Sequence, residues 1–119
     1  MNDLIKILNE TTALTTDVDL FAYEIPLGKT GLWASDAQID SRFNSVNTQE
    51  FDIYLRNKTK QSGIANIKYL KDRIDYISTE ICELDDGTQF KLQILFNWDF
   101  MEKDSEGYYV WASRVRLTL

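Results

Sequence analysis

The last third of the chain alternates between apolar and polar residues. Residues 88–100 read TQFKLQILFNWDF, and every second position from Phe90 to Phe100 is apolar. These positions share one face of a strand: Phe90, Leu92, Ile94, Phe96, Trp98 and Phe100. A second run ends the sequence and keeps Tyr109, Trp111, Val115, Leu117 and Leu119 in step. With the acidic segment 101–107 between the two runs, the pattern predicts a long closing β-hairpin with one apolar side.

The earlier segments predict two helices. Residues 2–14 carry apolar side chains at helical spacing, which favours a short amphipathic helix. The clearer helix has an apolar stripe formed by Ile67, Leu70, Ile74 and Ile77. Thr59 and Ser62 are both candidates to cap it.

Two further strands are expected: residues 17–25 form one that Pro26 ends, and residues 50–56 alternate strictly. Residues 80–84 are expected to be either a short strand or an extended link before the turn at 85–87. Residues 27–47 have no periodicity and are expected to be a long loop. The predicted fold is therefore one α+β domain over residues 1–119. It has a mainly antiparallel sheet, two helices packed on one face, and a long C-terminal β-hairpin.

Composition and charge limit the function classes. The chain of 119 residues has one cysteine, a net charge of −6 and no apolar run long enough to cross a bilayer. We expect a soluble product of a reducing compartment that is neither a membrane protein nor a general nucleic-acid binder. Residues 55–82 hold six cations against three anions, whereas both flanking segments are acidic. In an oligomer, such opposed patches can meet across subunits.

Candidate chemistry is sparse. The chain has no histidine, which removes histidine bases and histidine metal ligands, and its lone Cys82 cannot form a four-thiolate zinc site. Gly28-Lys29-Thr30 lacks the first glycine of a phosphate-binding loop. The acidic segment near Asp104 does not have the ligand spacing of a calcium loop. The residues predict a protein that is not an enzyme and needs no cofactor or metal.

Recognition by a partner is the remaining class of function. Trp33, in the aperiodic segment, is the first candidate for an interface anchor, because loop aromatics are enriched where partners dock. The full set of candidate interface residues is Trp33, Lys29, Phe43, Glu102, Asp104, Glu106, Arg56 and Lys58.

Residues 51–119 contain a recurring order of segments. A strand ending in Arg56 precedes the alanine-containing helix 65–77, and the hydrophobic strand 90–100 follows. An aspartate-and-glycine turn at 104–107 leads into an aromatic strand with alternating arginines, Arg114 and Arg116. This order resembles the tail-terminator family of long-tailed bacteriophages, whose members are also labelled minor capsid or tail completion proteins. The N-terminal helix fits by order only, and residues 27–47 have no counterpart.

The resemblance implies a non-enzymatic virion protein that is assembled in the host bacterial cytoplasm. Tail terminators form hexameric rings that cap the tail tube, stop its polymerisation and join it to neck or head-completion proteins. The implied partners are further copies of the chain, the major tail tube protein and a neck protein, with DNA passing through the ring without specific binding. Two alternatives remain open. One is another neck, head-completion or tail-tube subunit, and the other is a small acidic protein-binding module, such as an immunity or anti-defence protein.

Overall fold

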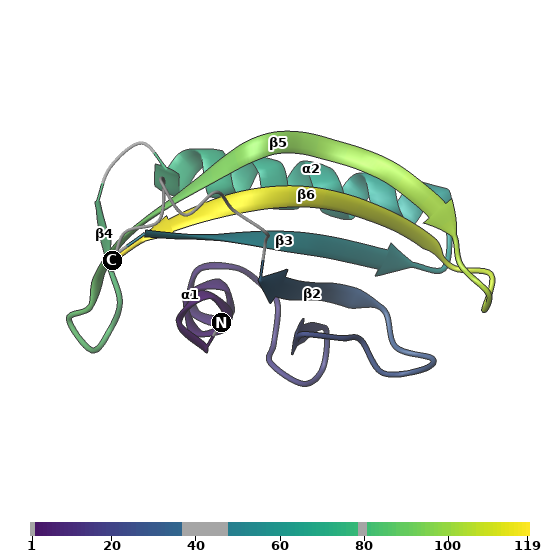
Figure 1. The fold of residues 1–119 in the computed structure, drawn as a ribbon, viewed down its shortest axis with the longest axis horizontal. Coiled ribbons are helices and arrows are strands. Elements are labelled where there is room, and N and C mark those ends of the chain that lie inside the picture. The colour runs from purple at the N-terminus through teal and green to yellow at the C-terminus, as the bar shows by residue number, and fades with distance from the viewer. Residues whose placement is uncertain (1, 37–47, 79–80) are drawn as a thin grey trace.

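The computed structural model describes residues 2–36, 48–78 and 81–119. Within these residues the chain forms two helices and one curled, six-stranded sheet (Figure 1). The elements are α1 (Asn2–Thr11), β1 (Leu20–Ala22), β2 (Gly31–Asp36), β3 (Thr48–Asn57), α2 (Lys60–Ser78), β4 (Cys82–Glu83), β5 (Gln89–Lys103) and β6 (Tyr109–Thr118). The strand order is β1-β2-β3-β6-β5-β4, with β1 parallel to β2 and every other neighbouring pair antiparallel. The predicted α+β class and the closing hairpin are confirmed.

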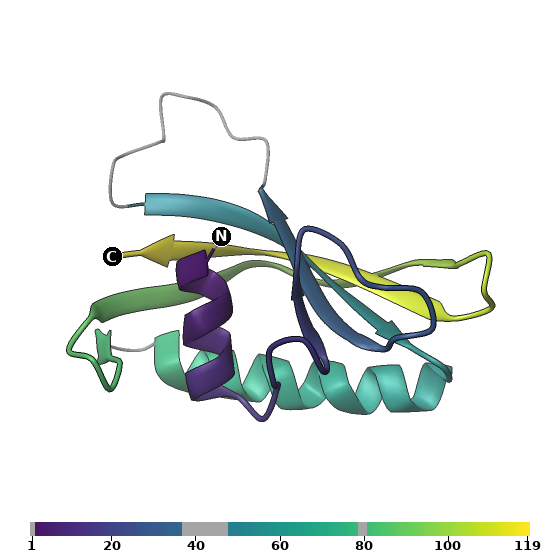
Figure 2. The same ribbon diagram turned by 90° about the horizontal axis from the view of Figure 1, so that it is seen from below.

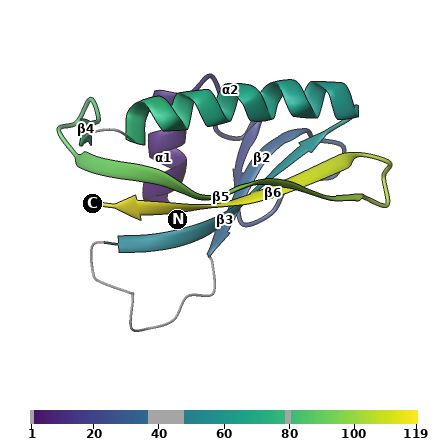
Figure 3. The same cartoon turned by 90° about the horizontal axis from the view of Figure 1, so that it is seen from above.

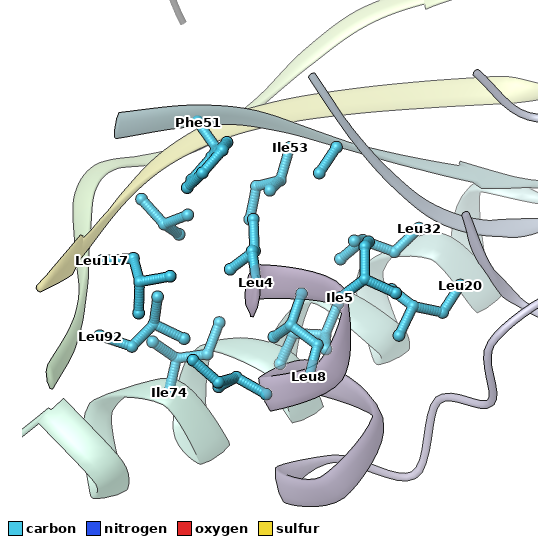
Figure 4. Close-up of a cluster of buried hydrophobic side chains, with 14 of the residues drawn as sticks. Leu4, Ile5, Leu8, Leu20, Leu32, Phe51, Ile53, Ile74, Leu92 and Leu117 are labelled. Carbon is cyan, nitrogen blue, oxygen red and sulfur yellow. The ribbon is translucent and has the colours of Figure 1, made fainter. Parts of the chain in front are cut away.

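Both helices pack on the same face of the sheet, so the core lies between one helical layer and one sheet layer (Figures 2 and 3). Leu4 and Leu8 from α1 meet Ile74 from α2 below the side chains of β3 and β6 (Figure 4). Phe51 and Ile53 supply the sheet side of this cluster and are almost fully buried. We call the helix-covered face of the sheet the inner face and the opposite face the outer face. Neither helix in the described part of the chain is long and apolar enough to span a membrane.

Helix α2 follows its predicted stripe, and its first turn is fixed by local contacts. The backbone N–H of Ser62 donates to Oγ1 of Thr59 at 3.1 Å, so Thr59 is the capping residue. Gly63 lies one turn further on and is buried against the indole ring of Trp111. A Cβ atom at Gly63 would lie 2.2 Å from that ring, so only glycine lets the helix approach β6 this closely.

The N-terminal half of the sheet differs from the prediction in two places. The strand expected at 17–25 is limited to β1, because Asp17 and Tyr23 have positive φ angles of 66° and 67°, which bend the chain on either side. The segment expected to be a loop contains β2, so the prediction of a structureless stretch is wrong for residues 31–36. Its short apolar pattern, with Leu32 and Ala34 on the inner face, carries little periodic signal. Residues 37–47, including the candidate Phe43, lie outside the described residues.

Strand β5 departs from the regular alternation that the sequence predicts. The register with β6 shifts between Ile94 and Phe96, between Phe96 and Asp99, and between Phe100 and Glu102. At each shift β5 has one residue more than β6, which is a β-bulge, and each bulge moves the following side chains to the other face. Phe96 consequently lies opposite Arg114 on the outer face and is 57% exposed. The prediction that Phe96 belongs to the buried face is therefore wrong.

The next bulge returns β5 to the predicted phase. Trp98 is half-buried and packs against the core, and Phe100 meets Trp111 edge-on, with 5.6 Å between the ring centroids. Phe100 is nevertheless 46% exposed, because it lies beyond the main hydrophobic cluster, next to the start of α2.

Candidate functional site

In the part of the chain that the structure describes, no helix covers the outer face of the sheet, and this face carries most of the predicted interface residues. Strand alternation directs Phe51, Ile53 and Leu55 of β3 inward, so Tyr54 and Arg56 point outward. Two ion pairs cross between β3 and β6 on this face, Asp52 with Arg114 at 2.9 Å and Glu50 with Arg116 at 3.9 Å. These side chains remain partly exposed, so the ion pairs lie along an accessible surface.

Arg56 differs from the other outward arginines because it is buried. Its exposed fraction is 4%, although it ends a strand on the open side of the sheet. Its Nη2 atom pairs with the Glu106 carboxylate, and its Nε atom lies 2.7 Å from Oδ2 of Asp104. The Nε–H is not aligned for a hydrogen bond, so the contact with Asp104 is an ion pair. The guanidinium group also lies 4.3 Å from the ring centroid of Tyr108, a favourable distance for a cation–π contact.

The hairpin tip that covers Arg56 is organised by Asp104. Its Oδ1 atom accepts hydrogen bonds from the backbone N–H groups of Glu106 and Tyr108, at 3.0 and 2.9 Å. Its backbone N–H donates to the carbonyl of Tyr108, and Gly107 supplies the positive φ of 85° that the turn requires. One carboxylate oxygen of Asp104 therefore shapes the turn while the other faces Arg56. The acidic tip is held down on the sheet by this contact.

The segment between β1 and β2 is fastened to the same arginine. Nη1 of Arg56 donates to the carbonyl oxygen of Lys29 at 3.4 Å, and the N–H of Gly28 donates to Oε2 of Glu106 at 3.4 Å. Arg56 thus joins three parts of the chain that are distant in sequence: the end of β3, the β5–β6 tip and the β1–β2 connection. Such a buried charge is stable only where its partners are all present.

A hollow of about 340 Å³ opens between the β5–β6 tip and the β1–β2 connection. The rings of Trp33 and Tyr54 line it and stack on each other, with centroids 5.0 Å apart and an angle of 21° between planes. Leu27 and Met101 also line it and are 85% and 57% exposed, which is unusual for large apolar side chains. Its charged lining residues are Arg56, Glu102, Asp104 and Glu106. Three carboxylates against one guanidinium make its charge negative, and we call it the acidic hollow.

The structure brings most of the predicted interface residues together in this hollow. Its lining contains five of them: Trp33, Arg56, Glu102, Asp104 and Glu106. Trp33 lies on β2 and is half-buried, so its predicted position in a loop is wrong. Lys29 contributes its backbone carbonyl to Arg56, while its side chain is exposed. Lys58 is exposed after β3 and does not line the hollow.

Apart from Trp33, the apolar part of the lining was not predicted from the sequence. Tyr54 had a usable signal, because it shares the outward phase of β3 with Arg56. Leu27 and Met101 had none, since neither belongs to a periodic run that marks the outer face. These two side chains reach the hollow only because the β5–β6 tip and the β1–β2 connection fold over the sheet.

The chemistry of the acidic hollow suits binding of an apolar side chain with a cation beside it. Stacked aromatic rings and two exposed apolar side chains offer contact area, and the carboxylates favour a positively charged neighbour. Across residues 2–36, 48–78 and 81–119, no three His, Cys, Asp or Glu side chains converge in a way that would hold a metal ion. No protein-family model matches this sequence, and no curated protein matches it significantly.

Proposed function

We propose that this chain is a structural protein of a long-tailed bacteriophage that caps the tail tube as a ring, the role of a tail terminator. The observation that carries the proposal is a contact between two of the segments on which the family resemblance rests. The arginine that ends β3 and the aspartate-and-glycine turn of the closing hairpin, 48 positions apart from Arg56 to Asp104, form one ion-pair cluster around a buried guanidinium group. Two segments that resemble the family in order therefore also form one structural unit.

The surface chemistry supports an assembly role. A ring made from one kind of subunit needs two different, complementary faces on each copy, because its contacts are head-to-tail. The acidic hollow provides one face with exposed apolar side chains, which monomeric proteins seldom gather in one place. The remaining acidic surface would repel passing DNA, which is compatible with a channel that DNA crosses without specific binding.

Two other functions make different predictions. A tail-tube subunit would polymerise into open tubes, whereas a terminator would form closed rings. A small acidic binding module would take one tight protein partner and form no ring of its own. Negative-stain imaging separates rings from tubes, and native mass spectrometry separates both from a one-to-one complex.

The direct test is tube capping. Mixed with the tail-tube subunit of the same phage, the purified chain should stop elongation, so that tubes become shorter and end in a ring at one tip. Electron microscopy of tube lengths measures this. Tubes of unchanged length, together with a chain that stays monomeric at high concentration, would contradict the proposal.

A further inference from the structure

The first three turns of helix α2, before Asp72, carry a second surface whose charge is opposite to that of the acidic hollow. Ile64 is 56% exposed, and Lys60 and Lys68 lie one helical turn on either side of it. Lys71 lies one further turn along the same side, and all three lysines are exposed. We call Lys60, Ile64, Lys68 and Lys71 the basic flank. It presents one large apolar side chain framed by cations.

Contacts inside the chain fix the direction that the basic flank faces. Nζ of Lys60 lies 5.2 Å from the ring centroid of Phe100, which places the flank beside β5. The other side of α2 faces the end of α1 and the segment that follows it. There the Tyr69 hydroxyl accepts a hydrogen bond from the N–H of Ala13, and Arg73 donates to the carbonyl oxygen of Thr11. The basic flank is therefore turned away from α1, toward the β5 side of the molecule.

The two surfaces lie on opposite sides of the sheet. The acidic hollow opens on the outer face over β2 and β3. Helix α2 lies on the other side of the sheet, where it covers the inner face (Figure 3). A single copy cannot bring them together, but two copies can, with the hollow of one on the helix of the next. Contacts between two different faces of identical chains are head-to-tail and generate rings when the rotation closes.

We propose that the basic flank of one copy docks into the acidic hollow of the next, with Ile64 inserted between Leu27 and the ring of Trp33. Lys68 and its neighbours then face Glu102 at the rim. The assignment rests on the proposed function for the closure of the ring, but the contact itself rests on these residues.

A second copy fits the hollow because this chain supplies both halves of the contact. Arg56 already pairs with Asp104 and Glu106, which leaves Glu102, exposed and lining the hollow, as the carboxylate best placed for an external cation. The basic flank offers three cations and an apolar side chain that matches the aromatic lining. Opposite charges orient such an encounter, and the buried apolar anchor holds it.

Disulfide trapping tests the contact. The variant carries Leu27→Cys and Ile64→Cys in a Cys82→Ser background, so that these are its two thiols. Because the two positions lie on opposite sides of one chain, a disulfide between them must join different copies. Mild oxidation should yield a ladder of linked chains on a denaturing gel. We expect at least about tenfold more of it than in the control, because docking raises the effective concentration of the thiols.

The matched control pairs Ile64→Cys with Val18→Cys, which is 62% exposed and belongs to neither surface. Each single-cysteine chain should stop at dimers. A ladder no stronger than that of the Val18 control overturns the contact. If rings then still form and cap tubes, the terminator proposal stands without this interface; if the ladder forms but tubes grow past the protein, the interface stands and the terminator proposal fails.

Charge reversal gives a second readout in the same two-cysteine chain. Glu102→Lys or Lys68→Glu alone should lower the yield of the ladder about tenfold, because like charges then face each other across the contact. Both changes in one chain restore opposite charges and should bring the yield back to within about threefold of the starting chain. A double variant as poor as either single variant would contradict the pairing of Glu102 with Lys68.

Discussion

Replacing Arg56 with alanine is expected to lower the free energy of unfolding by about 3 kcal/mol, a large share of the stability of a domain this size. The side chain is 4% exposed and meets the carboxylates of Asp104 and Glu106. Its removal takes away the cation that both of these carboxylates contact. It also ends the contact with the ring of Tyr108 and the hydrogen bond to the carbonyl of Lys29.

Arg114→Ala is the matched control for Arg56→Ala. Arg114 also points outward from a central strand and pairs with a carboxylate, Asp52, at 2.9 Å. Both of these side chains are more than a quarter exposed, so water already screens the pair and its loss should cost no more than about 1 kcal/mol. Urea denaturation followed by circular dichroism measures both values. Equal costs for the two arginines would mean that the β5–β6 tip does not depend on Arg56.

The same substitution bears on assembly. Arg56 holds the β5–β6 tip and the β1–β2 connection, which form the walls of the acidic hollow. In Arg56→Ala these walls lose the side chain that holds both of them. In the Leu27→Cys, Ile64→Cys chain, Arg56→Ala should therefore lower the yield of the disulfide-linked ladder as well as the stability. Arg114 does not line the hollow, and its loss should leave the ladder unchanged.

The elements that could be predicted are those whose burial follows a fixed period. The apolar stripe of α2 is buried at Leu70, Ile74 and Ile77, because a long helix repeats its pattern over several turns. The alternation of β3 is equally regular, and the structure extends that strand only slightly, from 50–56 to 48–57. Strand β2 could not be read in the same way, because its inner positions are one leucine and one alanine between polar and aromatic neighbours.

The candidate site was predictable as a set of residues but not as an arrangement. Arg56 and the acidic turn are both visible in the sequence, and their pairing depends on the register between β3 and β6. In that register Arg56 lies opposite Val110, next to the end of β6 from which the β5–β6 tip extends, so the tip can fold over the Arg56 side chain. A register is set by many cross-strand contacts at once, so it cannot be predicted from any single residue.

The bulges of β5 lead to the second large effect. Phe90→Ala should lower the free energy of unfolding by about 3–5 kcal/mol, because the ring is 2% exposed in the core and its loss leaves a cavity. Phe96→Ala removes the same atoms from a ring that is 57% exposed, and should cost no more than about 1 kcal/mol. A regular strand would give both rings one environment, because they are six positions apart and share its alternation.

Thermal and urea denaturation of the two phenylalanine variants therefore test whether the bulge is present. The extra residue between Ile94 and Phe96 moves the Phe96 ring to the outer face. There the ring centroid lies 5.6 Å from the Cζ atom of the Arg114 guanidinium group. A cost for Phe96→Ala as large as that for Phe90→Ala would place both rings in the core and remove the bulge. A small cost would instead mean that β5 gives up part of its apolar face to bend with the sheet, since bulges increase the local twist of a strand.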